Sequence, residues 1–307
     1  MPRVSAPANP EALVNELSQK VNTQKAEMEK AIVTSVLVQL REACKGLETD
    51  NWIKAKAQAI PVVSIGYSLQ DAETLSCFYT VLEDSEISLR VHHLTEEVIR
   101  INQAHYSAWA WRWQCFEALL SDHSELLEQE LRFLQDIATL NAKNYQLWNY
   151  RRRFAQFCRA DHAEAELEFA HACLVEDAKN YHAWAHRQAV VAMAGLWQAE
   201  LQYTGEVLEE DVRNNSAWSQ RFFVLSAQPD RIGDRVLAEA NFTSQKLHLV
   251  PHNMSAWNYL LGLLKVSAGP ANMHQICLDI CRQVLQGSPD CAPAKASQAV
   301  ILQAQPQ

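Results

Sequence analysis

The sequence predicts an all-α protein, a right-handed superhelical array of antiparallel helical hairpins. A tryptophan-containing segment recurs five times, and successive tryptophans are 39, 36, 34 and 39 residues apart. This period suits two helices and two short turns per unit. No proline lies between Pro61 and Pro229, and no glycine between Gly66 and Gly195. Sheet-rich folds place these residues at closely spaced turns, so the sequence argues against a β architecture.

The composition excludes several classes of protein. Asp and Glu number 36 against 27 Lys and Arg, a net charge of −9, whereas duplex nucleic-acid binders carry a basic surplus. The phosphate-binding patterns GxGxxG and GxxxxGKS/T are absent. There is no stretch of 18 apolar residues and no secretory signal, and the eight cysteines are scattered. We therefore expect a cytoplasmic protein that has no membrane span and binds no nucleic acid.

Two segments precede the repeats. Residues 1–45 contain a charged amphipathic stretch and predict an N-terminal helical segment of a different type from the repeats. Residues 46–85 include Pro61-Val62-Val63 and predict an irregular connector into the first repeat.

The repeat array is expected over residues 86–290. Its five repeats lie near 86–121, 122–160, 161–195, 196–228 and 230–267, and a partial one follows at 270–287. Amphipathic stretches predict the first helix of each hairpin, over Ser88–Ile101, Glu125–Leu140, Ala163–Glu176, Gln198–Glu209 and Arg235–Leu249. Residues 291–307 are expected to form a C-terminal tail.

Each copy of the tryptophan segment predicts the start of a helix. The copies read HYSAWAWR (105–112), NYQLWNYR (144–151), NYHAWAHR (180–187), NNSAWSQR (214–221) and NMSAWNYL (253–260). Four of them begin with an asparagine, which predicts an N-cap whose side-chain oxygen accepts a backbone N–H. His105 takes this place in the first copy.

The tryptophan and arginine of each copy fall on the same helical face as the cap. They stand four and seven residues after it, a helical spacing. They are Trp109, Trp148, Trp184, Trp218 and Trp257, with Arg112, Arg151, Arg187 and Arg221. We interpret them as structural residues that pack repeat against repeat, with the arginine stems along the rings. The fifth copy has Leu260 instead of arginine, which leaves its packing open.

Some histidines and cysteines are spaced like metal ligands. Cys277 and Cys281 are four residues apart and follow His274, while His92-His93 and the pair His182 and His186 also lie on predicted helices. Apolar neighbours such as Ile276 and Ile280 favour core positions for the cysteines. Isolated histidine pairs on helices are more often packing or surface residues. We therefore expect no metal site in this chain.

The repeated segments resemble the α subunits of protein prenyltransferases. The stretches LNAKNYQLWNYRR (140–152) and EDAKNYHAWAHRQ (176–188) carry the resemblance most clearly, together with EDVRNNSAWSQR (210–221) and LVPHNMSAWNYL (249–260). The match is closest to the α subunit shared by protein farnesyltransferase and geranylgeranyltransferase type I, and it covers about residues 50–265.

The resemblance implies a subunit of a heterodimeric enzyme. The β subunit would hold the catalytic Zn2+, and Mg2+ would assist the departure of diphosphate. The reaction would transfer a farnesyl or geranylgeranyl group from its diphosphate to a cysteine near the C-terminus of a CaaX-terminated acceptor protein. The alternative is a non-catalytic helical-repeat scaffold that binds peptides or partner proteins, as tetratricopeptide arrays do. The irregular repeat spacing argues against that alternative.

The resemblance also implies roles for individual residues. Lys143 would meet the diphosphate, Tyr145 would lie beside the peptide and isoprenoid, and Gln146 would bond the C-terminal carboxylate of the acceptor. A second cluster near the diphosphate would comprise Asn180, Tyr181 and His182. From the residues alone, Lys143 and Lys179 add positive charge next to helix N-termini, which favour anions. The same residue types also fit plainer roles, Asn180 as a cap and the two tyrosines as hairpin packing.

Overall fold

The computed structural model describes residues 66–158, 162–228, 232–265 and 272–304, and every regular element within these ranges is a helix. The predicted N-terminal segment 1–45 lies outside the described residues. The chain divides into two compact units that join at Thr139 and Leu140. The prediction of an all-α helical repeat array is confirmed, while its handedness stays a prediction.

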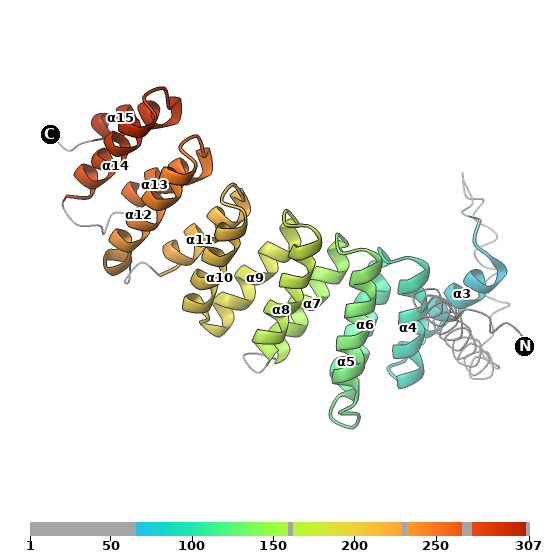
Figure 1. Cartoon of the computed structure of the whole chain (residues 1–307). Coiled ribbons are helices and arrows are strands. Elements are labelled where there is room, and N and C mark those ends of the chain that lie inside the picture. The colour runs from blue at the N-terminus through green and yellow to red at the C-terminus, as the bar shows by residue number, and fades with distance from the viewer. Residues whose placement is uncertain (1–65, 159–161, 229–231, 266–271, 305–307) are drawn as a thin grey trace, which may run out of the picture. The chain divides into compact units, whose positions relative to one another are not determined.

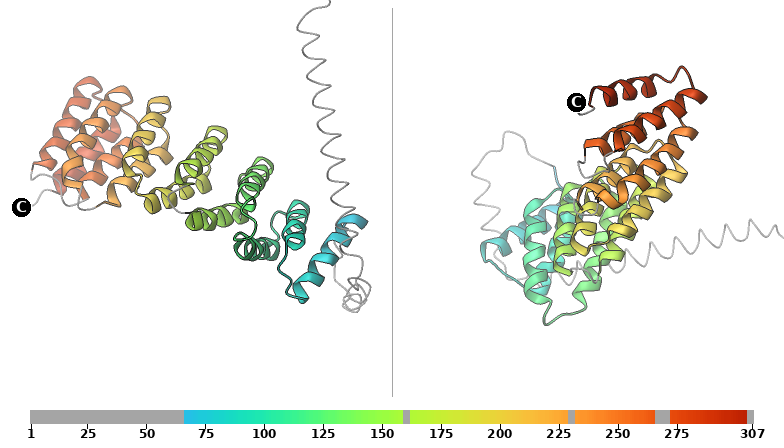
Figure 2. Two further views of the ribbon diagram at one scale, coloured as in Figure 1. Left: turned by 90° about the horizontal axis from the view of Figure 1, so that it is seen from below. Right: turned by 90° about the vertical axis from the view of Figure 1, so that its left-hand side faces the viewer.

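The helices alternate along each unit as the two arms of successive hairpins (Figure 1). The first unit contains α3 (Leu69–Glu83), α4 (Leu89–Ile101), α5 (Tyr106–Leu119) and α6 (Leu126–Leu140). The second contains α7 (Tyr145–Cys158), α8 (Ala163–Glu176), α9 (Tyr181–Ala194), α10 (Trp197–Glu210), α11 (Asn215–Ser226), α12 (Ile232–Leu249), α13 (Met254–Lys265), α14 (Met273–Gly287) and α15 (Ala292–Gln303). Within the second unit, α8 packs on α9, α10 on α11, α12 on α13 and α14 on α15 (Figure 2).

The helices that begin with the tryptophan segment, α5, α7, α9, α11 and α13, are here called the motif helices. In the second unit consecutive motif helices also pack against each other, α7 on α9, α9 on α11 and α11 on α13. Each hairpin therefore buries its apolar face partly against the next, as expected of a repeat protein.

The same turn precedes every motif helix. The asparagine at the cap accepts first-turn N–H groups, for example from Gln146 to Asn144 Oδ1 at 2.8 Å. The tryptophan four residues on is buried and donates its Nε1–H to the carbonyl two residues before the cap. The five bonds run from Trp109 to Gln103, Trp148 to Ala142, Trp184 to Ala178, Trp218 to Val212 and Trp257 to Pro251, at 2.7–3.0 Å. The tryptophan thus fixes the turn as well as filling the core.

Each motif arginine forms a buried ion pair with a glutamate of the helix that follows it. The Nε–carboxylate distances are 2.7 Å for Arg112 and Glu130, 2.8 Å for Arg151 and Glu166, 3.0 Å for Arg187 and Glu200, and 2.6 Å for Arg221 and Glu239. The guanidinium lies over the aromatic ring three residues after the glutamate, 3.7 Å above Phe133 in the first case. The arginines therefore link one repeat to the next through an ion pair and through an aromatic ring outside the motif.

The fifth motif helix replaces this charge pair by apolar packing. Leu260 is fully buried, and the buried residues of the following helix α14 are all apolar or cysteine. They are Met273, Cys277, Leu278, Ile280, Cys281 and Val284. The fifth repeat therefore lacks both the arginine and its glutamate, and Leu260 packs in an apolar environment instead.

Part of the expected connector 46–85 is a helix. Ser68 caps α3 by accepting the N–H of Asp71 at 3.1 Å, and the apolar residues Leu75, Phe78 and Val81 are buried at three-residue intervals. This amphipathic face packs on α4. The part of the connector over Leu69–Glu83 therefore belongs to the helical array, and residues 46–65 lie outside the described residues.

The expected tail 291–307 is largely helix α15. Cys291 occupies the cap position, and its Sγ–H donates to the carbonyl of Pro251, which also accepts from Trp257. Ala294, three residues after this cap, is fully buried like Ala183, Ala217 and Ala256 in the same place. The pair α14 and α15 is thus a sixth hairpin, whose motif lacks both the asparagine and the tryptophan.

Candidate functional site

The residues predicted to contact substrates come from two adjacent turns of the second unit. Lys143 precedes α7, and Tyr145 and Gln146 are the first two residues of that helix. Asn180 caps α9, whose first residues are Tyr181 and His182. Because α7 packs on α9, the two groups lie side by side on one surface of this unit.

Three aromatic side chains join the two turns. The ring centroids of Tyr145 and Tyr181 are 6.0 Å apart, and both rings contact His182, at 4.5 Å and 3.9 Å. His182 is buried and lies parallel to Trp148 at 6.2 Å, whereas Tyr145 and Tyr181 are 70% and 55% exposed. We call Tyr145, Tyr181 and His182 the aromatic cluster. It offers two exposed phenol rings on a buried imidazole.

Two members of the aromatic cluster, Tyr181 and His182, have shifted pKa values. Desolvation and hydrogen bonding to Tyr145 raise the pKa of Tyr181 to about 12. Burial lowers the pKa of His182, although a hydrogen bond to the backbone of Lys143 opposes this shift. The phenol of Tyr181 therefore stays protonated and can donate a hydrogen bond, and the imidazole of His182 stays uncharged.

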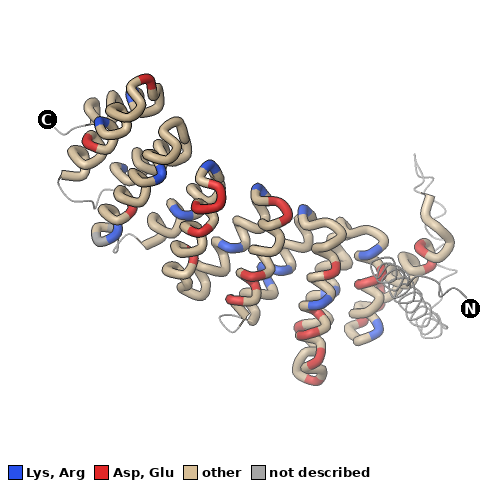
Figure 3. Tube along the Cα trace, viewed as in Figure 1, with Lys and Arg blue, Asp and Glu red and all other residues tan. Residues whose placement is uncertain are grey.

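Lys143 and Lys179 supply positive charge at the two turns, and Lys143 precedes α7. The side chain of Lys143 is 71% exposed, and its Nζ lies 2.9 Å from Asp177 Oδ2. The hydrogen bond from Lys143 lowers the pKa of the Asp177 carboxyl, so this carboxyl is ionised at neutral pH. Figure 3 shows basic residues beside acidic ones at the turns before α9 and α11.

Asn180 is buried, and both its side-chain oxygen and its side-chain nitrogen form hydrogen bonds to the backbone. Its Oδ1 accepts the N–H groups of His182 at 3.1 Å and Ala183 at 3.2 Å, and its Nδ2 donates to the carbonyl of Ala142 at 3.1 Å. The side chain therefore ties the turn before α9 to the turn before α7. Its contact with a substrate stays a prediction, as does that of the half-buried Gln146 with a carboxylate.

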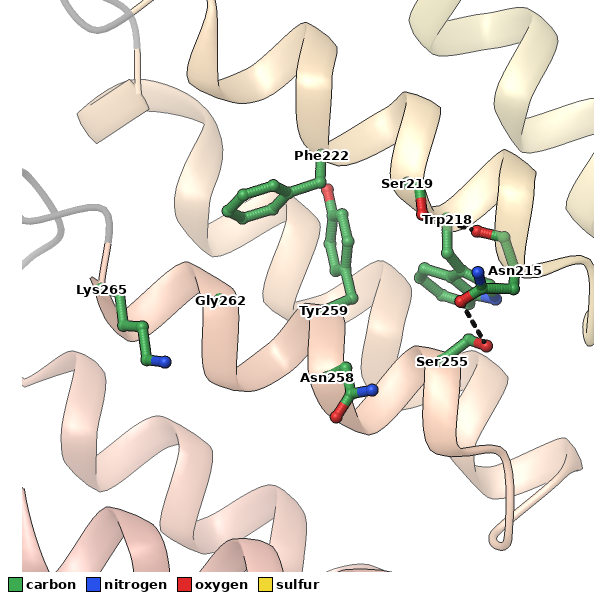
Figure 4. A pocket seen from close by; sticks show the side chains of 9 residues that line it. All are labelled: Asn215, Trp218, Ser219, Phe222, Ser255, Asn258, Tyr259, Gly262 and Lys265. Atoms are coloured by element: carbon green, nitrogen blue, oxygen red, sulfur yellow. Dashed lines mark hydrogen bonds between the residues drawn. The ribbon is translucent and has the colours of Figure 1, made fainter. Parts of the chain in front are cut away.

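The later motif helices carry a different surface. Asn215 and Met254 stand where Tyr145 and Tyr181 stand, at the first position of their helices. Between α11 and α13 lies an open hollow of about 360 Å3, shown in Figure 4. It is lined by Asn215, Trp218, Ser219, Phe222, Ser255, Asn258, Tyr259, Gly262 and Lys265. A Cβ atom at Gly262 would lie 2.8 Å from the Phe222 ring, so glycine permits this close packing.

Among the described residues, no group of three or more His, Cys, Asp or Glu side chains could hold a metal ion. Burial raises the pKa of Cys277 to about 12 and that of Cys281 to about 11, which disfavours the thiolate that metals bind. Two of the candidate histidines have carboxylate partners, since His92 pairs with Glu130 and His186 with Glu166. Of the helices in the described ranges, none is long and apolar enough to cross a membrane.

Sequence reasoning missed the glutamates of the buried ion pairs and Asp177. A signal for the glutamates was present, because each is followed three residues later by Phe or Tyr. These pairs are Glu130 and Phe133, Glu166 and Phe169, Glu200 and Tyr203, and Glu239 and Phe242. Asp177 had no such signal, since an aspartate at a helix end is ordinary turn chemistry.

The fold and the surface define an α-hairpin repeat protein whose capped turns gather exposed tyrosines and a lysine. The protein prenyltransferase alpha subunit repeat matches residues 90–119, 127–158, 163–194, 197–228 and 236–266. Each matched segment lies inside one of the five predicted repeats. The chain belongs to the family of protein prenyltransferase α subunits.

Several relatives are named as the alpha subunit of protein farnesyltransferase/geranylgeranyltransferase type-1. The one from Schizosaccharomyces pombe is 34% identical over 220 residues, which cover 72% of each chain. The one from Solanum lycopersicum is 43% identical over 208 residues, 67% of this chain and 59% of the relative. A solved structure of Candida albicans protein geranylgeranyltransferase-I complexed with GGPP matches with a TM-score of 0.62 and 26% identity, covering 80% of this chain and 88% of that one.

Proposed function

We propose that this chain is the α subunit of a heterodimeric protein prenyltransferase of the farnesyltransferase and geranylgeranyltransferase type I class. It would work only with a β subunit, and would transfer a farnesyl or geranylgeranyl group from its diphosphate to the cysteine of a CaaX-terminated acceptor. The observation that carries this proposal is the surface where Lys143 stands beside the exposed rings of Tyr145 and Tyr181.

The exposed rings support a surface that a partner covers. Two tyrosines at 70% and 55% exposure present apolar ring faces and hydroxyl groups, and tyrosine is enriched at protein interfaces. We propose that the β subunit covers this part of the second unit and that the isoprenoid diphosphate binds between the two subunits.

Lys143 supplies the charge that the reaction needs. When the acceptor thiolate attacks C1 of the isoprenoid, the C1–O bond breaks and negative charge grows on the departing diphosphate. The caps already occupy the N–H groups of Gln146, His182 and Ala183. These backbone donors are therefore not free to bind the anion, which favours the Lys143 ammonium beside the exposed rings as the group that stabilises it. The protonated hydroxyl of Tyr181 can add a neutral hydrogen bond.

The metals implied by the family belong to the partner in this proposal. Zn2+ in the β subunit would hold the acceptor cysteine as a thiolate, and Mg2+ would accompany the diphosphate. The described residues of this chain do not fit a Zn2+ site. The chain's own part is to bind, orient and stabilise charge. A cytoplasmic location is also part of the proposal.

Co-expression with a β subunit tests the function. The purified complex should transfer labelled farnesyl or geranylgeranyl to a peptide ending in a CaaX motif, and a peptide with serine in place of that cysteine should stay unlabelled. The chain alone should be inactive. A complex that forms but transfers neither group would contradict the proposal, and peptide binding by the chain alone would favour the scaffold alternative.

A further inference from the structure

The carboxylate of Asp177 links the two turns that form the candidate site. Asp177 follows α8 in an extended backbone conformation. Its Oδ1 accepts the backbone N–H of Lys179 at 3.0 Å, and its Oδ2 lies 2.9 Å from Lys143 Nζ. One oxygen therefore anchors the carboxylate to its own turn, while the other holds the lysine of the neighbouring turn.

The other turns of the array show that the charge of Asp177 is not needed for the turn itself. Asn102 and Asn141 occupy the corresponding positions, and their Oδ1 atoms accept the equivalent N–H at 3.0 and 3.1 Å. Asp211 does the same with Arg213 at 2.9 Å, and among the described residues it forms no ion pair. An amide oxygen therefore closes this turn as well as a carboxylate does. The negative charge at Asp177 serves the contact with Lys143.

We infer that Asp177 is a positioning residue that holds the Lys143 ammonium at the edge of the aromatic cluster, ready for the departing diphosphate. This inference rests on the proposed function of Lys143. A lysine side chain has four flexible bonds, and one that is 71% exposed would otherwise sample many rotamers. The contact restricts the ammonium, and the exposed pair is weak enough for a multiply charged diphosphate to draw the lysine toward itself.

The inference predicts opposite effects on binding and on transfer. Asp177→Asn keeps the oxygen that closes the turn but removes the charge that holds Lys143. The single-turnover transfer rate should fall about threefold to tenfold, the factor expected when a flexible side chain must be ordered during the reaction. The Kd for the isoprenoid diphosphate should stay equal or tighten, because a negative charge near the anion has been removed. If Asp177 had a merely structural role, Asp177→Asn would slow transfer, weaken binding of the isoprenoid diphosphate and lower the melting temperature.

The experiment uses the α/β complex, with Asp211→Asn as the matched control for an equivalent turn. That control should leave the transfer rate, the Kd and the melting temperature unchanged. In a Lys143→Ala background, Asp177→Asn should slow transfer no further, because Asp177 acts through that lysine. A wild-type transfer rate for Asp177→Asn, or an equal loss in both backgrounds, would overturn the inference.

A second measurement does not depend on catalysis. Acylation by a small lysine reagent, read residue by residue by mass spectrometry, should modify Lys143 faster in Asp177→Asn than in the wild-type chain. Lys179 serves as the internal reference. Equal rates at Lys143 would refute the positioning contact. If the wild-type complex transferred no isoprenoid, the proposed function would be refuted. The labelling result would still show whether Asp177 restrains Lys143.

Discussion

At the scale of single residues, the repeats are joined by buried arginine–glutamate pairs at positions that apolar side chains could also fill. Arg187 contacts Glu200 through two nitrogens and lies over the ring of Tyr203 at 3.6 Å, and Gln220 donates to the same glutamate at 2.7 Å. Leu260 and the apolar residues around it show that the array can also fill this position with uncharged side chains. A buried ion pair adds less to stability than its removal costs, because the remaining charge is left without a partner.

The pair of Arg187 and Glu200 gives a direct test of this asymmetry. Glu200→Ala should lower the free energy of unfolding by about 3–5 kcal/mol, since it leaves a buried guanidinium unpaired. Arg187→Met combined with Glu200→Leu should cost clearly less than the sum of the single changes. Urea unfolding measures both. The exposed Glu206→Ala on the same helix is the control, with an expected change within about 0.5 kcal/mol. Additive losses would show that the pair is not coupled.

The buried carboxylates also predict a dependence of stability on pH. Burial alone would raise the pKa of Glu130, but Arg112 and His92 together lower it to about 2. A carboxyl whose pKa is depressed in the folded protein stabilises it above the unfolded pKa, and this contribution is lost as the pH falls. The melting temperature should therefore drop between about pH 5 and pH 2. Glu130→Gln should start from a lower melting temperature and lose less over this range, whereas a slope equal to wild type would contradict the assignment.

At the scale of elements, much of the helical order could be predicted from the sequence. Ala163–Glu176 was expected as a helix and is α8, and the asparagines of the motif do cap their helices. These features are local, because a cap and an amphipathic face need only neighbouring residues. The helices α3 and α15 were missed because Ser68 and Cys291 open them without the asparagine and tryptophan of the motif.

The candidate site was harder to predict than the helices. That Tyr145 and Tyr181 share one surface follows from the repeat, since equivalent positions of stacked hairpins lie on the same side. The contact of Lys143 with Asp177 joins residues 34 positions apart, and helical periodicity says nothing of such pairs. For the same reason the sequence alone indicated solvent-facing positions for the glutamates of the buried ion pairs, because their arginine partners lie on a different helix.

The two kinds of aromatic residue in the motif should respond differently to truncation. Trp184→Ala should cost about 3–5 kcal/mol of folding free energy, because it empties a core position and removes the Nε1 bond to Ala178. Tyr145→Ala changes an exposed ring and should leave the stability of the chain nearly unchanged, while weakening its function in the complex. Thermal unfolding of the two variants separates them. Equal destabilisation would show that Tyr145 is a packing residue.

At the scale of the whole molecule, the chain is a helical framework, and the proposed chemistry uses one pair of its adjacent turns. The second unit contains helices α7 to α15, and within its described residues an exposed lysine and exposed tyrosines come together at the start of α7 and α9. Asn215 and Met254 replace the tyrosines on α11 and α13, so the chemistry does not extend along the array. A surface of this kind fits the proposed role, in which this chain supplies charge and shape and a partner completes the reaction.

The role of Lys143 in the heterodimer is the central claim, and single-turnover transfer measures it most directly. Lys143→Ala should assemble with the β subunit as the wild type does, and its transfer rate should fall about 10²- to 10³-fold, the loss seen when one contact to a developing anion is removed. Assembly with an unchanged transfer rate would show that the departing diphosphate does not depend on this lysine, and would contradict the account.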